Sequence, residues 1–162
     1  MPAVDLVVTD LDGTLWHTDD HVPDAVLAAW AELERRGVPI LVATGRRLAS
    51  TREPLARVGL TPPAVVLNGA LGVDLHDGAR FHRAPFPTDE ALAVYDAFTG
   101  VGLSPVVYVD HPRYDVFLSP SPDTHPGHVA MLGVTAGTAP EPVDETGMAS
   151  ESKPPWAIAN LA

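Results

Sequence analysis

Strand and helix patterns alternate with short links through the first 70 residues, and this alternation constrains the fold more than any other feature of the chain. Apolar runs of strand length, rich in β-branched residues, alternate with stretches whose apolar residues recur at helical spacing. We expect strands over residues 3–9, 38–43 and 64–67, and helices between Asp24, a predicted N-cap, and Gly37 and over residues 48–58. This order predicts right-handed βαβ units, a parallel sheet and an α/β fold.

The pattern changes after the third predicted strand. Asp77-Gly78 is a dipeptide typical of two-residue hairpin turns, and it lies between the strand-like runs 73–76 and 79–82. The chain therefore leaves the parallel sheet for an antiparallel excursion. Further along, we expect a helix over residues 89–98 and a strand over residues 105–109.

Polar residues follow each of the three predicted parallel strands. Asp10 and Asp12 come after the first strand, Thr44 and Arg46 after the second, and Asn68 after the third. The carboxyl ends of parallel strands meet at one edge of a sheet, where α/β folds bind their ligands. We therefore expect these side chains to share one site.

The two aspartates are the most informative of these residues, within the run Asp10-Leu11-Asp12-Gly13-Thr14-Leu15. Two carboxylates this close repel each other unless a cation or a shared proton lies between them. A hard divalent ion such as Mg²⁺ supplies that cation through oxygen ligands. One carboxylate can then attack phosphorus while the other donates and accepts a proton. Taken alone, an Asp-x-Asp pair more often caps a loop or a helix.

Three segments together resemble the Cof-type phosphatases of the haloacid dehalogenase superfamily. Residues 10–15 resemble the first motif of that superfamily, Ala43-Thr44-Gly45-Arg46 looks like the second, and Leu67-Asn68-Gly69-Ala70 looks like the Cof-type segment that ends the third strand. The resemblance spans roughly residues 4–109. It implies a partial Rossmann-like, parallel three-layer core and the beginning of an inserted αβ-type cap.

The resemblance also implies roles for individual residues. Asp10 is the nucleophile that forms an aspartyl phosphate and a ligand of Mg²⁺, and Asp12 is the general acid and base, with its main-chain carbonyl on the metal. Thr44 and the Gly45 N–H hold the phosphoryl group, whose charged oxygens need fixed donors. Supporting contacts come from Arg46 and Asn68. The implied function is Mg²⁺-dependent hydrolysis of a small phosphorylated metabolite.

Some of these residues have a second interpretation. Arg46 fits a structural arginine paired with Asp or Glu as well as it fits a cation near the substrate, and Asn68-Gly69 alone is an ordinary turn. Trp16, directly after the first motif, either contacts the substrate or packs against the cap.

Two further motifs of the family have no convincing match: a cation for the phosphoryl charge, and a second acidic cluster that completes the metal site. Lys153, the only lysine, lies in a segment unlike the family's lysine segment. We expect the chain to represent the N-terminal half of a phosphatase, with impaired activity. Truncation, a shifted reading frame from about Gly133 and a partner that supplies the missing half are the competing explanations, and we favour truncation because the motifs that are present are intact.

The domain organisation follows from this interpretation. Residues 1–70 form the first half of the core, residues 71–132 a partial cap, and residues 133–162 an irregular tail rich in proline. Few periodic patterns occur after Ser119, and we predict no regular structure for most of that region.

Composition narrows the classes of partner. Ten Lys and Arg residues against 21 Asp and Glu residues give a net charge of −11, which repels a phosphate backbone and excludes nucleic-acid binding through a basic surface. The absence of cysteine excludes disulfides, thiolate catalysis and cysteine-bound zinc. The N-terminus carries no cluster of positive charge, and no apolar run reaches the roughly 18 residues of a membrane span. We therefore expect a cytoplasmic protein without membrane contact.

Two other classes of function stay open on the sequence. A non-catalytic remnant keeps the crevice and binds phosphate without the metal. A sugar phosphotransferase or phosphomutase uses the same nucleophile and passes the phosphoryl group to a hydroxyl instead of water. The sequence predicts neither the substrate nor the oligomeric state.

Overall fold

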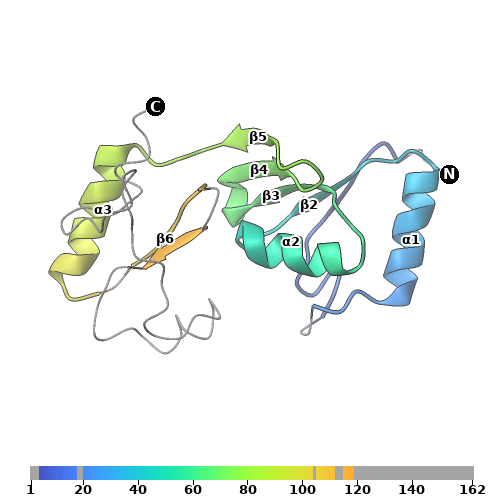
Figure 1. The fold of residues 1–162 in the computed structure, drawn as a ribbon, viewed down its shortest axis with the longest axis horizontal. Coiled ribbons are helices and arrows are strands. Elements are labelled where there is room, and N and C mark those ends of the chain that lie inside the picture. Colours follow the sequence, from blue (N-terminus) through green and yellow to red (C-terminus); the bar gives the residue numbers. More distant parts are fainter. Residues whose placement is uncertain (1–3, 18–19, 104, 112–114, 119–162) are drawn as a thin grey trace. The chain divides into compact units, whose positions relative to one another are not determined.

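One mixed sheet of five strands forms the framework of the N-terminal part of the chain (Figure 1). The computed structural model describes residues 4–17, 20–103, 105–111 and 115–118. The strands, in sheet order, are β1 (Val7–Thr9), β2 (Ile40–Ala43), β3 (Pro63–Val66), β4 (Leu71–Asp74) and β5 (Arg80–Arg83). The first three are parallel, and the last two pair antiparallel with their neighbours. The predicted α/β class is confirmed.

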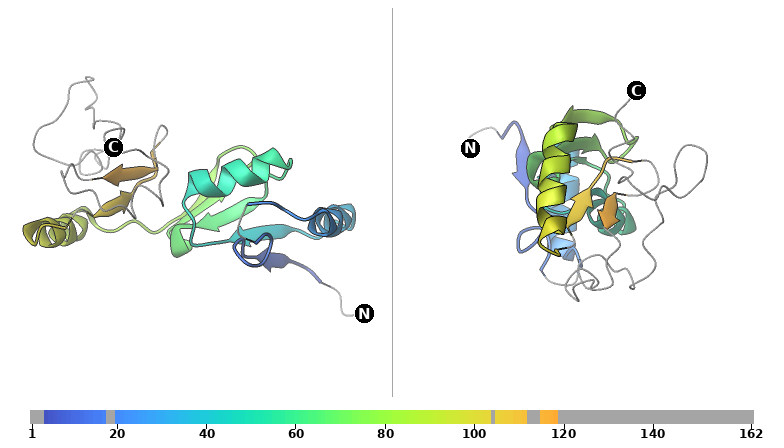
Figure 2. Two further views of the ribbon diagram at one scale, coloured as in Figure 1. Left: turned by 90° about the horizontal axis from the view of Figure 1, so that it is seen from below. Right: turned by 90° about the vertical axis from the view of Figure 1, so that its left-hand side faces the viewer.

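Two helices cover one face of this sheet. They are α1 (Asp24–Arg35) and α2 (Leu48–Arg57). Trp30 of α1 and Leu55 of α2 are buried in a single core with Ile40 and Val42 of β2. Figure 2 shows these helices and the sheet in two further views. Successive right-handed crossovers that add strands in one direction place their helices on the same face, which accounts for this arrangement.

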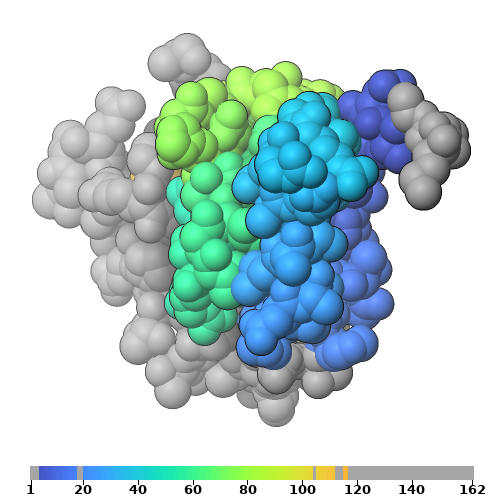
Figure 3. Space-filling model, turned by 90° about the vertical axis from the view of Figure 1, so that its right-hand side faces the viewer, coloured from blue at the N-terminus to red at the C-terminus, as the bar shows by residue number. Residues whose placement is uncertain are grey.

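The two ends of α1 show which of the predicted capping residues cap the helix. The helix begins at Asp24, after Pro23 in an extended conformation, and it has no side-chain N-cap. Asp24 is therefore a first-turn residue rather than the cap that we expected, and its negative charge there favours the helix dipole. Gly37 follows the helix with a φ of 69°, in the left-handed conformation that glycine adopts at helix ends. Figure 3 looks onto the outer side of α1, drawn in blue.

The opposite face of the sheet is apolar near its first strand. Leu6 and Val8 are 51% and 55% exposed, whereas Val42, Ala64 and Val66 on the covered face are fully buried. Strand alternation explains the contrast, since neighbouring residues of a strand point to opposite faces.

The β4–β5 hairpin continues the same sheet instead of leaving it. Its connection runs over residues 75–79 and is longer than the two-residue turn expected at Asp77-Gly78. The Gly78 N–H donates to the Asp74 carbonyl, and the Asp77 carboxylate accepts the Ala79 N–H, so the side chain helps to form the wider turn.

The chain divides into two compact units between Pro85 and Phe86. The second unit contains α3 (Thr88–Gly100), β6 (Val106–Tyr108) and β7 (Val116–Leu118), and β6 pairs antiparallel with β7. The helix and the first strand were expected, and β7 was not. The proposed tail and Lys153 lie outside the described residues. Within the described part of the chain, no helix is long and apolar enough to cross a membrane.

Candidate active site

The loop after β1 presents two aspartates in a fixed turn. Gly13, with a φ of 72°, permits the sharp change of direction, and its N–H donates to the Trp16 carbonyl over 2.8 Å. Leu11 and Trp16 are buried and anchor the loop in the core. The Asp10 carboxylate accepts the Leu11 N–H over 2.7 Å. The side chains of Asp10 and Asp12 therefore point in different directions from one turn that the core holds in place.

The end of β2 supplies groups suited to an anion. Thr44 is nearly buried at 8% exposure, its N–H donates to the Val65 carbonyl, and its hydroxyl accepts the Arg46 N–H over 3.2 Å. Gly45 lies so close to the third strand end that a Cβ there would stand 2.7 Å from the Asn68 Oδ1. Only glycine fits this approach without a shift of its neighbour.

The segment after β3 reaches this position through an uncommon backbone. Leu67 and Asn68 have φ values of 55° and 54°, in the left-handed region. Asparagine tolerates that region, whereas a leucine there costs on the order of 1–3 kcal/mol. The Leu67 N–H donates to the Arg46 carbonyl over 2.9 Å and ties the two strand ends together. Strain of this kind persists where the surroundings fix a functional conformation.

These elements line one open pocket of about 330 Å³. Four of the six predicted site residues line the pocket: Asp10, Thr44, Gly45 and Asn68. The remaining lining residues are Ala43, Val65 and Gly69. The carboxylate, the hydroxyl and the amide are the groups that an incoming phosphoryl group would meet.

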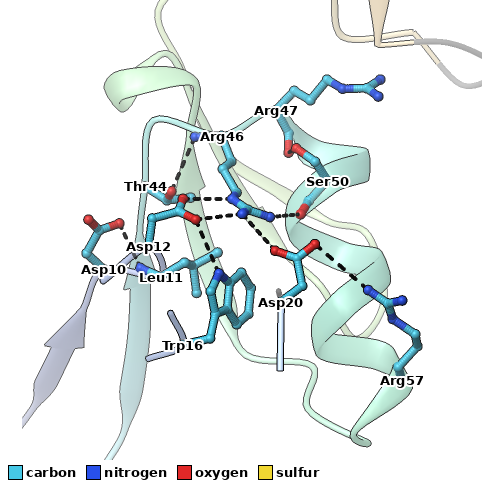
Figure 4. A network of polar contacts seen from close by, with 10 residues as sticks. All are labelled: Asp10, Leu11, Asp12, Trp16, Asp20, Thr44, Arg46, Arg47, Ser50 and Arg57. Atoms are coloured by element: carbon cyan, nitrogen blue, oxygen red, sulfur yellow. Dashed lines mark hydrogen bonds and ion pairs between the residues drawn. The ribbon is translucent and has the colours of Figure 1, made fainter. Parts of the chain in front are cut away.

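Asp12 and Arg46, the other two predicted residues, form a separate ion pair (Figure 4). Arg46 donates from Nε to Asp12 Oδ2 over 2.7 Å and from Nη2 to Asp12 Oδ1 over 2.6 Å. The Trp16 indole N–H donates to the same carboxylate over 3.2 Å, and the guanidinium lies 5.0 Å from the centre of the Trp16 ring. This is the paired arginine of the second interpretation, and Trp16 is a buried support rather than an exposed contact.

The ion pair sets the charge of Asp12. The hydrogen bond from Arg46 lowers the pKa of the Asp12 carboxyl below its ordinary value; partial burial opposes this, and the Trp16 indole and the positive charge of Arg46 add to the lowering. The hydrogen bond with Asp12 and the negative charge of its carboxylate raise the pKa of Arg46 in turn. Asp12 is therefore ionised here and acts as a hydrogen-bond acceptor.

Sequence reasoning missed a second carboxylate at this ion pair. Asp20 Oδ1 lies 2.7 Å from Arg46 Nη2, and Asp20 Oδ2 lies 4.0 Å from Arg57 Nη2. Asp20 stands outside every motif, in a run of polar residues with no periodic pattern, so only its position in the fold reveals the contact. We call Asp12, Arg46 and Asp20 the arginine clamp.

The chemistry of the oxygen ligands permits a test of the Mg²⁺ expectation. Asp10 offers a carboxylate to the pocket, and Mg²⁺ commonly binds one or two carboxylates together with waters and substrate phosphates. The Asp12 carboxylate is occupied by Arg46, which leaves the main-chain carbonyl of Asp12 as its contribution. The described residues contain no group of three or more metal-ligating side chains. The site thus fits a metal held largely by Asp10, water and substrate.

Comparison with known proteins agrees with this geometry. The family model of haloacid dehalogenase-like hydrolases matches residues 7–120. A phosphoglycolate phosphatase of Methanopyrus kandleri is 35% identical over 66 residues, which cover 41% of this chain and 28% of the relative. An HMP-PP phosphatase of Shigella flexneri serotype 5b is 33% identical over 89 residues, which cover 55% of this chain and 32% of the relative.

The fold has a counterpart among solved structures as well. A crystal structure from Thermotoga maritima matches with a TM-score of 0.68 at 20% identity, over 82% of this chain and 48% of that one. The chain spans about a third of the length of the two curated relatives above. The resemblance first inferred from three short motifs is confirmed, and the chain belongs to the haloacid dehalogenase-like hydrolase family.

Proposed function

We propose that the pocket binds the phosphoryl group of a small phosphorylated metabolite and that the protein is a Mg²⁺-dependent phosphatase. The observation that carries the proposal is the convergence of Asp10, Thr44, Gly45 and Asn68 on one pocket. Relatives named as phosphatases support it. The residues fit the two tasks of such a site, a nucleophile and fixed donors for the phosphoryl oxygens.

The proposed reaction has two steps. A carboxylate oxygen of Asp10 forms a bond to phosphorus while the ester P–O bond breaks, and Asp12 gives a proton to the departing oxygen. Water then attacks the aspartyl phosphate, Asp12 accepts a proton from it, and inorganic phosphate leaves. Thr44 and the Gly45 N–H hold the phosphoryl oxygens through both steps. Bound Mg²⁺ would supply positive charge that offsets the repulsion between Asp10 and the phosphoryl group.

The arginine clamp bears on these steps unequally. Asp12 is an ionised acceptor in the clamp, which is the form that the water-dependent second step needs. The first step needs a protonated Asp12, so we propose that Arg46 and Asp12 separate when the substrate binds. We also propose low activity for the isolated chain, since its described residues supply few metal ligands. The cap assignment of residues 71–132 and the cytoplasmic location stay predictions.

The direct test is hydrolysis of p-nitrophenyl phosphate by the purified chain with and without Mg²⁺. We expect slow, Mg²⁺-dependent release of p-nitrophenol that Asp10→Asn abolishes. Asp5→Asn is the matched control, because Asp5 is an exposed aspartate on the approach to the same strand. Equal rates in Asp10→Asn and Asp5→Asn would contradict the proposed nucleophile.

A second candidate is a phosphate-binding protein without catalysis. The occupation of the Asp12 carboxylate by Arg46 favours it, since a clamped Asp12 cannot serve as the acid. Phosphate binding measured by calorimetry separates the two. Affinity that ignores Mg²⁺, together with no turnover, favours the binding protein, and affinity that rises with Mg²⁺ favours the phosphatase.

A further inference from the structure

We propose that Asp20 and the main-chain carbonyl of Ser50 are positioning groups that hold Arg46 on Asp12 and away from the phosphoryl pocket. Neither group belongs to a motif of the chain. The consequence for catalysis rests on the role proposed above for Asp12, whereas the positioning itself is a property of the fold.

The guanidinium of Arg46 is held at each of its three nitrogens. Nε and Nη2 donate to Asp12, Nη2 also meets Asp20 Oδ1 at 2.7 Å, and Nη1 donates to the Ser50 carbonyl over 3.2 Å (Figure 4). The Trp16 ring closes one side of the group. An arginine held on all sides has one orientation, and the planar fork of a guanidinium transmits that orientation to the carboxylate that it binds.

The Ser50 carbonyl is available because of a proline. In α2 the carbonyl of residue 50 would normally accept the N–H of residue 54, but Pro54 has no N–H. The helix nevertheless continues through Pro54, which is buried. The helix thus leaves one carbonyl oxygen for the side chain of Arg46, and the sequence position of the proline determines which oxygen it is.

Asp20 brings a second carboxylate to the Arg46 guanidinium. Its φ of 54° is unusual for a residue other than glycine, and it brings the carboxylate to the side of Arg46 that faces α2. Arg57 near the end of α2 stands 4.0 Å from the other Asp20 oxygen. The side chain of Arg46 is 24% exposed, against 51% for Asp12, so the arginine is the more enclosed member of the pair.

This arrangement predicts which step each group affects. Asp12, Asp20 and Ser50 engage four of the five N–H groups of the Arg46 guanidinium, so the loss of Asp20 or of the Ser50 contact should affect the orientation of Asp12 more than phosphate binding. Released from Asp20, Arg46 gains freedom to leave Asp12. Because the proposed first step needs Arg46 to leave Asp12, the expected kinetic effect is a higher kcat with an unchanged KM.

Nuclear magnetic resonance tests the positioning without any need for activity. In ¹⁵N-labelled protein, the Arg46 Nε–H signal is identified by its loss in Arg46→Lys, and the Trp16 indole signal by its loss in Trp16→Phe. We expect Asp20→Asn to speed hydrogen exchange of the Arg46 Nε–H about tenfold, the order expected for losing a charge-assisted contact. The Trp16 indole signal should shift in the same variant.

Two further variants separate positioning from general loosening. Pro54→Ala returns an N–H to α2 that competes with Arg46 for the Ser50 carbonyl, and we expect faster Arg46 exchange there too. Glu53→Gln is the matched control, because it removes one exposed carboxylate from the same helix. Backbone signals of β2 and β3 report whether each variant is folded. Wild-type exchange and an unshifted indole in both folded variants would overturn the proposal.

Kinetics then connects the clamp to the reaction. If Asp20 acts through Arg46, Asp20→Asn raises kcat several-fold in the wild-type background and has no further effect in Arg46→Lys. Equal effects in both backgrounds would overturn the positioning role. A chain without turnover would count against the proposed function alone, since the exchange measurements still decide the positioning.

Discussion

The pocket lined by Asp10, Thr44, Gly45 and Asn68 and the arginine clamp (Figure 4) lie on either side of one short loop, and they are built in different ways. The pocket depends on backbone conformation: Gly45 permits a close approach, and the left-handed Leu67 and Asn68 complete it. The clamp depends on charged side chains around Arg46. Two aspartates separated by one residue thus occupy unlike surroundings. The pocket should be sensitive to changes of shape, and the clamp to changes of charge.

The largest effect is expected from a methyl group in the pocket. In Gly45→Ala the new Cβ would stand 2.7 Å from Asn68 Oδ1, so the Asn68 side chain must turn away from its position in the pocket. We expect the loss of measurable phosphate binding in calorimetry and, because a side-chain tip can shift, a stability loss of at most about 1 kcal/mol in urea unfolding.

Gly100→Ala is the control for that substitution. A Cβ at Gly100 meets no atom within 4 Å, and alanine favours a helix more than glycine does. Unchanged phosphate binding in Gly45→Ala would show that the pocket tolerates a change of shape. It would contradict the expectation that the pocket is sensitive to shape whereas the clamp is sensitive to charge.

A pair of threonines sharpens the assignment of the pocket. Thr44→Val removes the hydroxyl proposed to hold a phosphoryl oxygen, and we expect about tenfold weaker phosphate binding. Thr51→Val makes the same chemical change at a buried hydroxyl with no hydrogen-bond partner among the described residues. It should leave binding unchanged and preserve or raise stability. Equal loss of binding in both variants would contradict a specific role for Thr44.

The clamp should respond in the opposite way. Arg46→Lys keeps a positive charge but loses the forked contact with Asp12 and the flat contact with Trp16. We expect about 1 kcal/mol lower stability in urea unfolding and less than about a twofold change in phosphate affinity. A large loss of affinity would instead support the sequence-based prediction that Arg46 binds the substrate.

The smallest effect on stability is expected at an exposed ion pair on the surface of α1, which belongs to neither the pocket nor the clamp. Hydrogen bonds from Arg35 and Arg36 lower the pKa of the Glu32 carboxyl to about 2. Because the pKa of Glu32 is lower in the folded state, its ionised carboxylate stabilises the folded protein at pH values above 4.5, the ordinary value. This contribution is lost as the pH falls toward about 2, where Glu32 becomes protonated in the folded protein as well. An NMR titration should show a low midpoint for Glu32 that rises in Arg35→Ala. Because the Glu32 carboxylate is exposed, we expect Arg35→Ala to change the stability of the protein less than Arg46→Lys does.

The sequence predicted the pocket better than the clamp, for physical reasons. Parallel strands deliver their carboxyl ends to one edge, so Asp10, Thr44 and Asn68 were expected together from strand order alone. The extension of the sheet by β4 was missed, since an Asp-Gly turn indicates a hairpin but not the sheet that it joins. Asp20 was missed because its contact depends on where an aperiodic loop crosses α2. Pro54 lies inside the predicted helix 48–58, but the role of the carbonyl that it frees depends on the position of Arg46, which the sequence does not show.

A crystal structure of the chain with Mg²⁺ and tungstate, an analogue of phosphate, tests the separation of the pocket from the arginine clamp. We expect the anion in the pocket, where the Thr44 hydroxyl and the Gly45 N–H bind it and Asp10 faces it. We expect no contact between the anion and Arg46. An anion bound by the Arg46 guanidinium, with Asp10 turned away, would contradict the separation of pocket and clamp.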